Sequence, residues 1–254
     1  MKKIIFFDTE TTGNTEKDFL CQIAYKSEDE IFSGLYKPPI KIPPEASAVH
    51  HITNKMLEDK PTFSESPDSK KIKKFFEDKD AVVVAHNAIF DLAIIKKENI
   101  VPSKFICTLR LARHLDPEGK IGKYNLQYLR YFLELEIEAT AHDAMGDVLV
   151  LEKLYERLKK KVMAKSNEVG SPDASTETSR EKGLSEDEAI EKMIEISSHP
   201  SLFKYINFGK YNGKELEKIA QVDRGYLEWL LAQKLESDQI DEDWIYTLQY
   251  YLAK

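Results

Sequence analysis

The N-terminal apolar run limits the possible folds of this chain more than any other feature. The run, residues 4–7, ends at two carboxylates, Asp8 and Glu10. It is shorter than the roughly seven apolar residues of a signal peptide and far shorter than the ~18 of a membrane span. Its bulky aliphatic and aromatic side chains are typical of a strand. Because strand residues two apart point to the same face, Asp8 and Glu10 are expected to project together.

Strand-like and helix-like segments follow one another along the first 161 residues. Three strand-like runs, KKIIFFDTE, DFLCQIAYKS and EIFSGLYK, predict a meander of three strands. The apolar run AVVVA predicts a further, buried strand. Helical patterns are expected over residues 69–79, 90–98, 109–115, 125–135 and 144–161. This combination predicts an α/β or α+β layered domain.

The composition changes after residue 161. The segment SNEVGSPDASTETSREKG is rich in Ser, Thr, Glu and Gly, and no aromatic residue occurs between Tyr155 and Phe203. Such a segment buries too little apolar surface to offset its ordering entropy, so it predicts a flexible linker. Beyond it, Ser185 and Glu188 form a capping-box pattern that predicts a helix start. The expected domains are residues 1–162, a linker at 163–184, and a small, mainly helical domain at 185–254.

The composition of the whole chain restricts its environment and its partners. With 42% hydrophobic and 32% charged residues, the chain is typical of globular proteins, and no membrane partner is expected. Its two cysteines, Cys21 and Cys107, do not suggest a disulfide framework, so a cytoplasmic location is expected. The net charge of −7 argues against a broad phosphate-binding surface. An enzyme acting on a strand end needs few phosphate contacts, however, and carboxylates at a metal site lower the net charge.

Carboxylates recur in two further segments. HNAIFD places Asp91 just after the AVVVA strand, where a helix begins, and HDAMGD places His142 and Asp147 at a loop-to-helix junction. Taken alone, either aspartate could serve the helix N-terminus, and His142 could be a capping or surface histidine. Together with Asp8 and Glu10 they supply four carboxylates and one histidine, the set that two-metal phosphodiester hydrolysis requires.

The residue types also predict which metal binds. Hard oxygen ligands suit two Mg²⁺ or Mn²⁺ ions, and the sequence contains no cysteine pair or histidine cluster with zinc spacing. One ion would lower the pKa of a bound water, and the other would stabilise the leaving 3′ oxygen. Because histidine titrates near neutrality, His142 is suited to accept the proton of that water.

The segments DTETTG, HNAIFD and HDAMGD resemble the three motifs of the DEDDh (DnaQ-like) 3′-to-5′ exonuclease superfamily. The resemblance implies an RNase H-like fold, in which helices flank a mixed sheet, and the release of 5′-mononucleotides in DNA repair or proofreading. It assigns the metal ligands to Asp8, Glu10, Asp91 and Asp147, and the general base to His142.

A second resemblance covers both domains. The segments AVHHIT, FICTLRLARHLDP, FGKYNGKELEKIA and DRGYLEWLL are similar to the exonuclease X group of this superfamily. The chain departs from many superfamily members at His51, where they have glycine in an HGIT motif. This departure bears on substrate contacts rather than on activity.

The resemblance also implies substrate contacts. The backbone from Thr9 to Thr11 would hold the terminal 3′-OH, and the terminal nucleotide pocket would be lined by His50, Ile52, Asn87 and Phe90. Alternatively, Ile52 and Phe90 are core residues and Asn87 is a turn residue.

Basic side chains offer less certain contacts. Phosphate contacts and solvated helix or loop charges are both open interpretations for Arg110, Arg113, Lys120 and Lys123. The C-terminal segment FGKYNGK could clamp a strand by charge and stacking, although acidic residues outnumber basic ones between residues 200 and 254.

Three functions follow from these observations. The first is a DNA-directed 3′-to-5′ exonuclease that acts on 3′ ends, chiefly single-stranded ones. The second is an exoribonuclease, and the third is a catalytically silent binding or polymerase-accessory subunit. The complete set of five catalytic residues argues against the third. The sequence leaves DNA and RNA open, because the 2′-OH is sensed by pocket shape rather than by a motif, and it predicts no particular protein partner.

Overall fold

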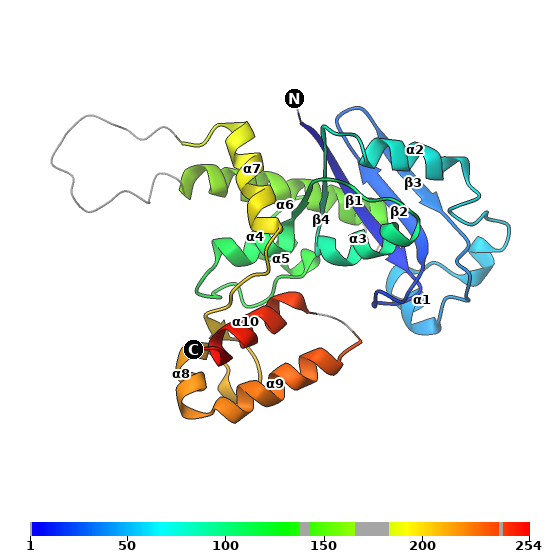
Figure 1. Cartoon of the computed structure of the whole chain (residues 1–254). Helices are drawn as coiled ribbons and strands as arrows, with labels where there is room; N and C mark the ends of the chain where they lie inside the picture. Colours follow the sequence, from blue (N-terminus) through cyan, green and yellow to red (C-terminus); the bar gives the residue numbers. More distant parts are fainter. Residues whose placement is uncertain (1, 138–142, 166–182, 239–240) are drawn as a thin grey trace.

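A five-stranded mixed sheet forms the centre of the computed structural model, which describes residues 2–137, 143–165, 183–238 and 241–254 (Figure 1). The strand order is β3-β2-β1-β4-β5. β1 pairs antiparallel with β2, and β2 with β3, whereas β4 is parallel to both β1 and β5. The predicted meander and the buried fourth strand are confirmed, and a short fifth strand is added. The strands are β1 (Lys3–Thr11), β2 (Leu20–Lys26), β3 (Ile31–Leu35), β4 (Ala81–Ala85) and β5 (Phe105–Cys107).

Helices cover both faces of the sheet, as the RNase H-like expectation requires. The residues of β1 alternate between two cores: Ile5 and Phe7 pack with the helices of one face, and Phe6 packs with those of the other. The first face carries α2 (Pro67–Phe76) and α3 (Ala88–Lys97). The second carries α4 (Thr108–Leu115), α5 (Leu126–Phe132) and α6 (Ala144–Lys165). A short helix, α1 (Pro44–His50), and a 3₁₀ turn, η1 (Asn54–Leu57), pack beside β2.

Helix α7 (Glu186–Ser197) follows the predicted linker and begins where the sequence indicates. Ser185 Oγ accepts a hydrogen bond from Glu188 N at 3.4 Å, and Glu188 Oε2 accepts one from Ser185 N at 2.8 Å, which completes the capping box. Its buried residues Ala189, Ile190 and Met193 lie in the core formed by β1, β4 and α6. The domain limits stay a prediction, and residues 166–182 lie outside the described residues. Within the described chain, however, α7 packs with the sheet domain.

The last part of the chain forms a small unit with its own core, called here the C-terminal module (residues 201–254). It contains α8 (Leu216–Val222), α9 (Arg224–Glu236), α10 (Glu242–Leu252), a two-stranded ribbon of β6 (Tyr205–Ile206) and β7 (Lys214–Glu215), and a 3₁₀ turn, η2 (Gly209–Tyr211). Leu216, Leu227, Trp244 and Leu248 are buried in its centre. Figure 1 shows its helices in orange and red, beneath the sheet domain. In the described parts of the chain, no helix has the length and apolar character of a bilayer span.

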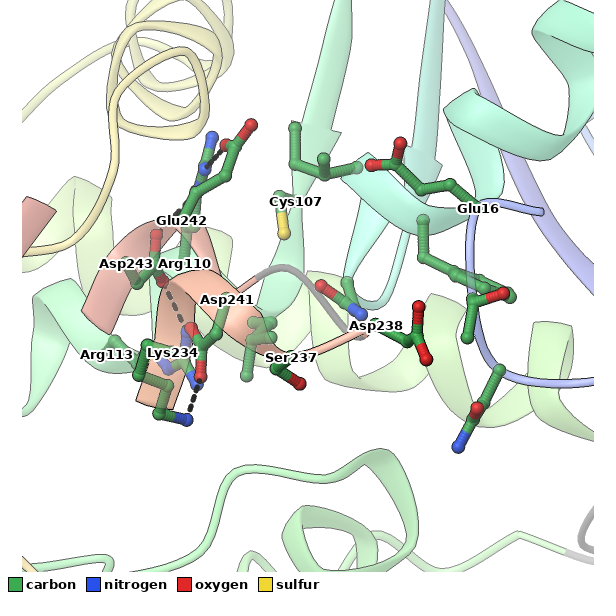
Figure 2. A pocket seen from close by; sticks show the side chains of 16 residues that line it. Glu16, Cys107, Arg110, Arg113, Lys234, Ser237, Asp238, Asp241, Glu242 and Asp243 are labelled. Carbon is green, nitrogen blue, oxygen red and sulfur yellow. Dashed lines mark hydrogen bonds and ion pairs between the residues drawn. The ribbon is translucent and has the colours of Figure 1, made fainter. Parts of the chain in front are cut away.

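The C-terminal module docks on α4 through buried ion pairs. Arg110 Nε lies 3.1 Å from Asp243 Oδ1, and Arg110 NH2 lies 2.6 Å from Glu242 Oε2. Arg110 NH1 donates to Ser197 O at 2.9 Å, and Arg113 NH1 pairs with Asp243 Oδ2. Figure 2 shows these side chains gathered at the start of α10. Arg110 and Arg113 are therefore engaged by the module, and the expectation that they are solvated or meet phosphates is wrong.

Candidate active site

Carboxylates from two of the sequence motifs meet at the end of β1. Asp8 and Glu10 have the same parity as Phe6, which faces α6, so their side chains project toward that helix. Asp147 lies in the first turn of α6, and the packing of Phe6 against Tyr155, with ring centroids 5.2 Å apart, holds this helix on β1. One carboxylate oxygen from each of Asp8, Glu10 and Asp147 lies within 4.8 Å of the others. This spacing fits a shared metal ion.

Asp91 joins the site from the first turn of α3. It is 3% exposed, and its Oδ1 accepts hydrogen bonds from Thr9 N at 3.1 Å and from Thr9 Oγ1 at 2.6 Å. Thr9 lies between Asp8 and Glu10 on β1, so these bonds fix Asp91 beside the acidic pair. Asp91 is not one of the three residues whose oxygens lie within 4.8 Å of one another. It contributes charge from the other face of the strand.

Burial and mutual repulsion raise the pKa values of these carboxyls. Burial, followed by the charges of Asp91 and Glu10, raises the pKa of Asp8 well above its usual value. Burial and the charge of Asp147 raise the pKa of Glu10 to about 8, and burial raises that of Asp91 to about 7 despite the hydrogen bonds from Thr9. Within the described chain, no lysine or arginine forms an ion pair with Asp8, Glu10 or Asp91. Converging carboxylates without cationic side chains fit a divalent metal centre.

Polar residues that the sequence did not single out support the site. Gln127 Nε2, from α5, donates to Asp147 Oδ1 at 2.5 Å. Gln22 Nε2 donates to Asp143 Oδ1, and Gln22 Oε1 accepts from Ala144 N, each at 3.3 Å. Asp143 could have been found from the sequence, because it adjoins His142 in the motif HDAMGD. No sequence motif marks Gln127, because only the packing of α5 brings its amide to Asp147.

His142 falls at residues 138–142, outside the described residues. Its role as general base therefore stays a prediction. The four carboxylates of the predicted set all lie in the described chain, and the fold brings them to one end of β1.

The predicted substrate residues divide into two groups. In the first, His50 Nε2 donates to Thr11 O at 3.2 Å, and Ile52 N donates to His50 Nδ1 at 3.0 Å. Burial lowers the pKa of His50, which is consistent with a neutral ring joining α1 to the end of β1. Ile52 is 4% exposed and packs with Cys21, so it occupies a core position. His51 has a φ of 62°, which lies in the left-handed region. Because glycine adopts this conformation most readily, the angle explains why HGIT motifs have glycine at this position.

In the second group, Asn87 and Phe90 line a pocket of about 240 Å³ (Figure 2). Asn87 is the N-cap residue of α3, with φ 64°. Lys234 and Asp241 of the C-terminal module line the same pocket, which therefore lies between the module and the sheet domain. The substrate roles of Thr9, Thr11 and both groups stay predictions.

Comparisons with known proteins agree with this geometry. Residues 5–155 match the RNase_T family model, described as Exonuclease, and residues 206–234 match the model described as Exodeoxyribonuclease X-like C-terminal. Exodeoxyribonuclease 10 of Escherichia coli K12 is 29% identical over 224 residues, which cover 87% of this chain and 84% of that protein.

Two further similarities point the same way. DNA polymerase III subunit epsilon of Treponema pallidum is 34% identical over 161 residues, which cover 59% of this chain and 73% of that protein. The solved structure of Exonuclease X in complex with 5′ overhanging duplex DNA has a TM-score of 0.54 and 25% identity. The match covers 76% of this chain and 99% of that one.

Proposed function

Because this chain belongs to the RNase_T exonuclease family, we propose that it hydrolyses DNA from the 3′ end and releases 5′-mononucleotides. The observation that carries the proposal is the convergence of Asp8, Glu10 and Asp147, with oxygens within 4.8 Å, beside the buried Asp91. Converging carboxylates whose charges raise one another's pKa values are suited to divalent cations.

The chain's own residues define the mechanism. Asp8, Glu10, Asp91 and Asp147 would hold two Mg²⁺ or Mn²⁺ ions, which when bound would lower the pKa of a water molecule and neutralise charge on the phosphate. Thr9 orients Asp91, and Gln127 orients Asp147, through the hydrogen bonds described above. His142 accepts the proton of the attacking water. The backbone from Thr9 to Thr11, held by His50, positions the terminal 3′-OH.

Two similarities support DNA as the substrate. The relative of which this chain covers 84% is named an exodeoxyribonuclease, and the Exonuclease X structure contains duplex DNA. The similarity to a DNA polymerase III epsilon subunit supports a role in repair or proofreading. In this proposal, residues 1–162 carry the chemistry, and residues 185–254 modify it.

A digestion panel tests the proposal. The purified full chain is incubated with 5′-labelled single-stranded DNA, duplex DNA and RNA, with Mg²⁺, Mn²⁺ or excess EDTA. We expect a ladder that shortens from the 3′ end of DNA in both metals and no products in EDTA. Faster digestion of RNA would overturn the choice of DNA, and full activity in EDTA would overturn the metal mechanism.

Asp147→Asn is the matched control for a contaminating nuclease. The substitution keeps the size of the side chain and removes its charge, so ladders that persist in this variant would come from another protein.

A further inference from the structure

A groove of about 970 Å³ lies between the sheet domain and the C-terminal module. Its walls are the loop that joins α4 to α5, the end of α7, and β6 and α10 of the module. It is distinct from the acidic site, since none of Asp8, Glu10, Asp91 and Asp147 lines it.

The groove combines cations with aromatic rings. Lys123 precedes α5, Lys192 lies on α7, and Lys204 precedes β6 in the module. The aromatic side chains on the walls include Tyr205 and Tyr246, and Tyr246 is 42% exposed. Lysines that meet phosphates and exposed rings that stack on bases are the elements of single-stranded nucleic acid binding.

The acidic side chains of the groove are engaged by its own walls. Asp116 accepts from Lys120 N at 3.0 Å, from Ile121 N at 2.7 Å and from Tyr124 Oη at 2.8 Å. Glu118 pairs with the ammonium of Lys120 at 2.6 Å, and Glu195 pairs with Lys192 at 2.9 Å.

Two lysines of the groove, in contrast, form no salt bridge with the described residues. Lys123 forms no ion pair with any described residue, and Lys204 Nζ lies 5.3 Å from the centroid of the Tyr205 ring. Both are exposed. Although the chain has a net charge of −7, Lys123 and Lys204 form a local site where a phosphate backbone meets little repulsion.

One wall of the groove is anchored to the active site. His86 is buried, which lowers its pKa to about 4, and the neutral ring donates from Nε2 to Tyr124 O at 2.7 Å. Gln127, on the same segment, donates to Asp147. The next residue, Tyr128, lines the groove. The groove wall therefore begins one residue from a side chain that contacts a catalytic carboxylate.

Lys210 and Tyr211 of FGKYNGK, which do not line the groove, are less suited to bind a strand. Lys210 of FGKYNGK pairs with Asp223 at 2.9 Å, and Tyr211 Oη donates to the same carboxylate at 2.7 Å. Lys210 and Tyr211, which were expected to contact a strand, therefore bind a carboxylate of the module itself. The face that carries Lys204 and Tyr205 is the one held toward the sheet domain.

We propose that this groove binds the single-stranded DNA that lies 5′ of the nucleotide being removed. Lys123 and Lys204 contact its phosphates, and Tyr205 and Tyr246 stack on its bases. The inference rests on the proposed exonuclease function and gives the C-terminal module a role in it. The module holds a longer substrate while the terminal nucleotide occupies the active site.

A charge-reversal pair tests the phosphate contacts. The full chain with Lys123→Glu and Lys204→Glu is compared with a control carrying Lys74→Glu and Lys161→Glu. Both control lysines are exposed and lie outside the groove. Binding of a fluorescent oligothymidylate of about 20 nucleotides is measured by anisotropy in EDTA, so that no strand is cleaved. We expect the Kd of the groove variant to rise about tenfold or more. The slope of log Kd against log salt should fall by about 1.4, which is ~0.7 for each lost phosphate contact.

A second variant tests stacking without a change in charge. Tyr246→Ala should raise the Kd about fivefold or more, because stacking on one aromatic ring contributes at least that factor. Groove variants that bind the strand as tightly as the control would overturn the inference. A blunt duplex that competes as well as the single strand would overturn it too.

Kinetics separate the failure of this inference from the failure of the proposed function. On the long strand, the groove variants should raise KM and leave kcat nearly unchanged, because uniform binding is lost. On a trinucleotide, too short to reach the groove, they should match the control. A wild type that cleaves neither substrate contradicts the exonuclease proposal, whereas unchanged kinetics on the long strand contradict only the groove.

Discussion

Two acidic clusters of this molecule have opposite surroundings. At the docking site, Asp243 lies against the guanidinium groups of Arg110 and Arg113. At the active site, Asp8 and Glu10 face other carboxylates, which raise their pKa values in addition to burial. At the docking site, the carboxylate therefore attaches one domain to another. At the active site, the same group is suited to bind a cation.

The geometry of arginine explains why the docking site is complete. Arg110 directs three nitrogens at three different acceptors, and two of these acceptors are carboxylates of α10. A planar guanidinium can satisfy several acceptors at once, which offsets the cost of taking the charges out of water. At the active site, the donors that the described residues supply include the Thr9 hydroxyl and backbone N–H to Asp91 and the Gln127 amide to Asp147. Such donors orient the carboxylates without neutralising them.

The largest expected effects concern the active site. Asp147→Ala should abolish both metal binding and turnover, because it removes one of the three clustered carboxylates. His142→Ala should retain metal binding and lower kcat by roughly 10²- to 10⁴-fold, the usual contribution of a general base. Titration calorimetry with Mn²⁺ and steady-state kinetics measure the two quantities. If His142→Ala lost the metals as well, His142 would be a ligand or a structural residue.

The next effect concerns helix α7, which packs in the core of the sheet domain. A fragment of residues 1–162 lacks Ile190 and Met193, whose burial contributes about 3–6 kcal/mol in total. A fragment of residues 1–200 keeps them, and both fragments lack the C-terminal module. In urea unfolding, the shorter fragment should be the less stable by about that amount. Equal midpoints would show that α7 adds nothing to the core.

The docking site gives the next smaller effect. Asp243→Asn removes the buried carboxylate that pairs with both Arg110 and Arg113 and should lower the free energy of unfolding by about 3–5 kcal/mol. Glu242→Gln is the matched control: the Glu242 side chain is 47% exposed, so the loss should stay below about 1 kcal/mol. Urea denaturation measures both, and limited proteolysis should release the C-terminal module only from Asp243→Asn. Similar losses in the two variants would contradict the central place of Asp243.

The smallest effect concerns the charges of the metal-free active site. The folded-state pKa of Asp8 is raised, and that of Glu10 reaches about 8 against an ordinary 4.5, so ionisation opposes folding. The contribution of these two carboxyls to the stability of the metal-free protein should be fully present below about pH 4.5 and should be lost as the pH rises toward 8. Asp8→Asn removes one charge and should therefore be more stable than wild type at pH 8.

Melting temperatures in EDTA across this pH range check the sign. The difference between Asp8→Asn and wild type should vanish near pH 4, and saturating Mg²⁺ should reverse it at pH 8. A variant that is less stable than wild type at pH 8 in EDTA would show that the carboxylates do not repel one another.

Sequence patterns predicted much of the fold because they reflect local physics. The acidic pair at the end of β1 follows from alternation along a strand, and the start of α7 follows from the capping box at Ser185 and Glu188. The apolar run AVVVA could be assigned to a buried strand because its five residues face a core on both sides. Each of these inferences needed only neighbouring residues.

Contacts between distant segments could not be predicted in the same way. Arg110 and Asp243 are 133 positions apart, and a solvated helix charge has the same local pattern as a buried one. Gln127 gave no signal for the same reason. The composition of FGKYNGK suggested a strand clamp, but Asp223 engages Lys210, one of its two lysines, and Tyr211.

The sequence by itself predicted the candidate site of this protein: four carboxylates and a histidine in three motifs. Short-range periodicity and residue type are sufficient for that. Tertiary structure alone decided that α7 completes the first core, that Arg110 fixes the C-terminal module, and that Lys123 and Lys204 share one groove. These arrangements depend on which buried surfaces and charges meet after folding, and that pairing is a property of the whole chain rather than of any segment.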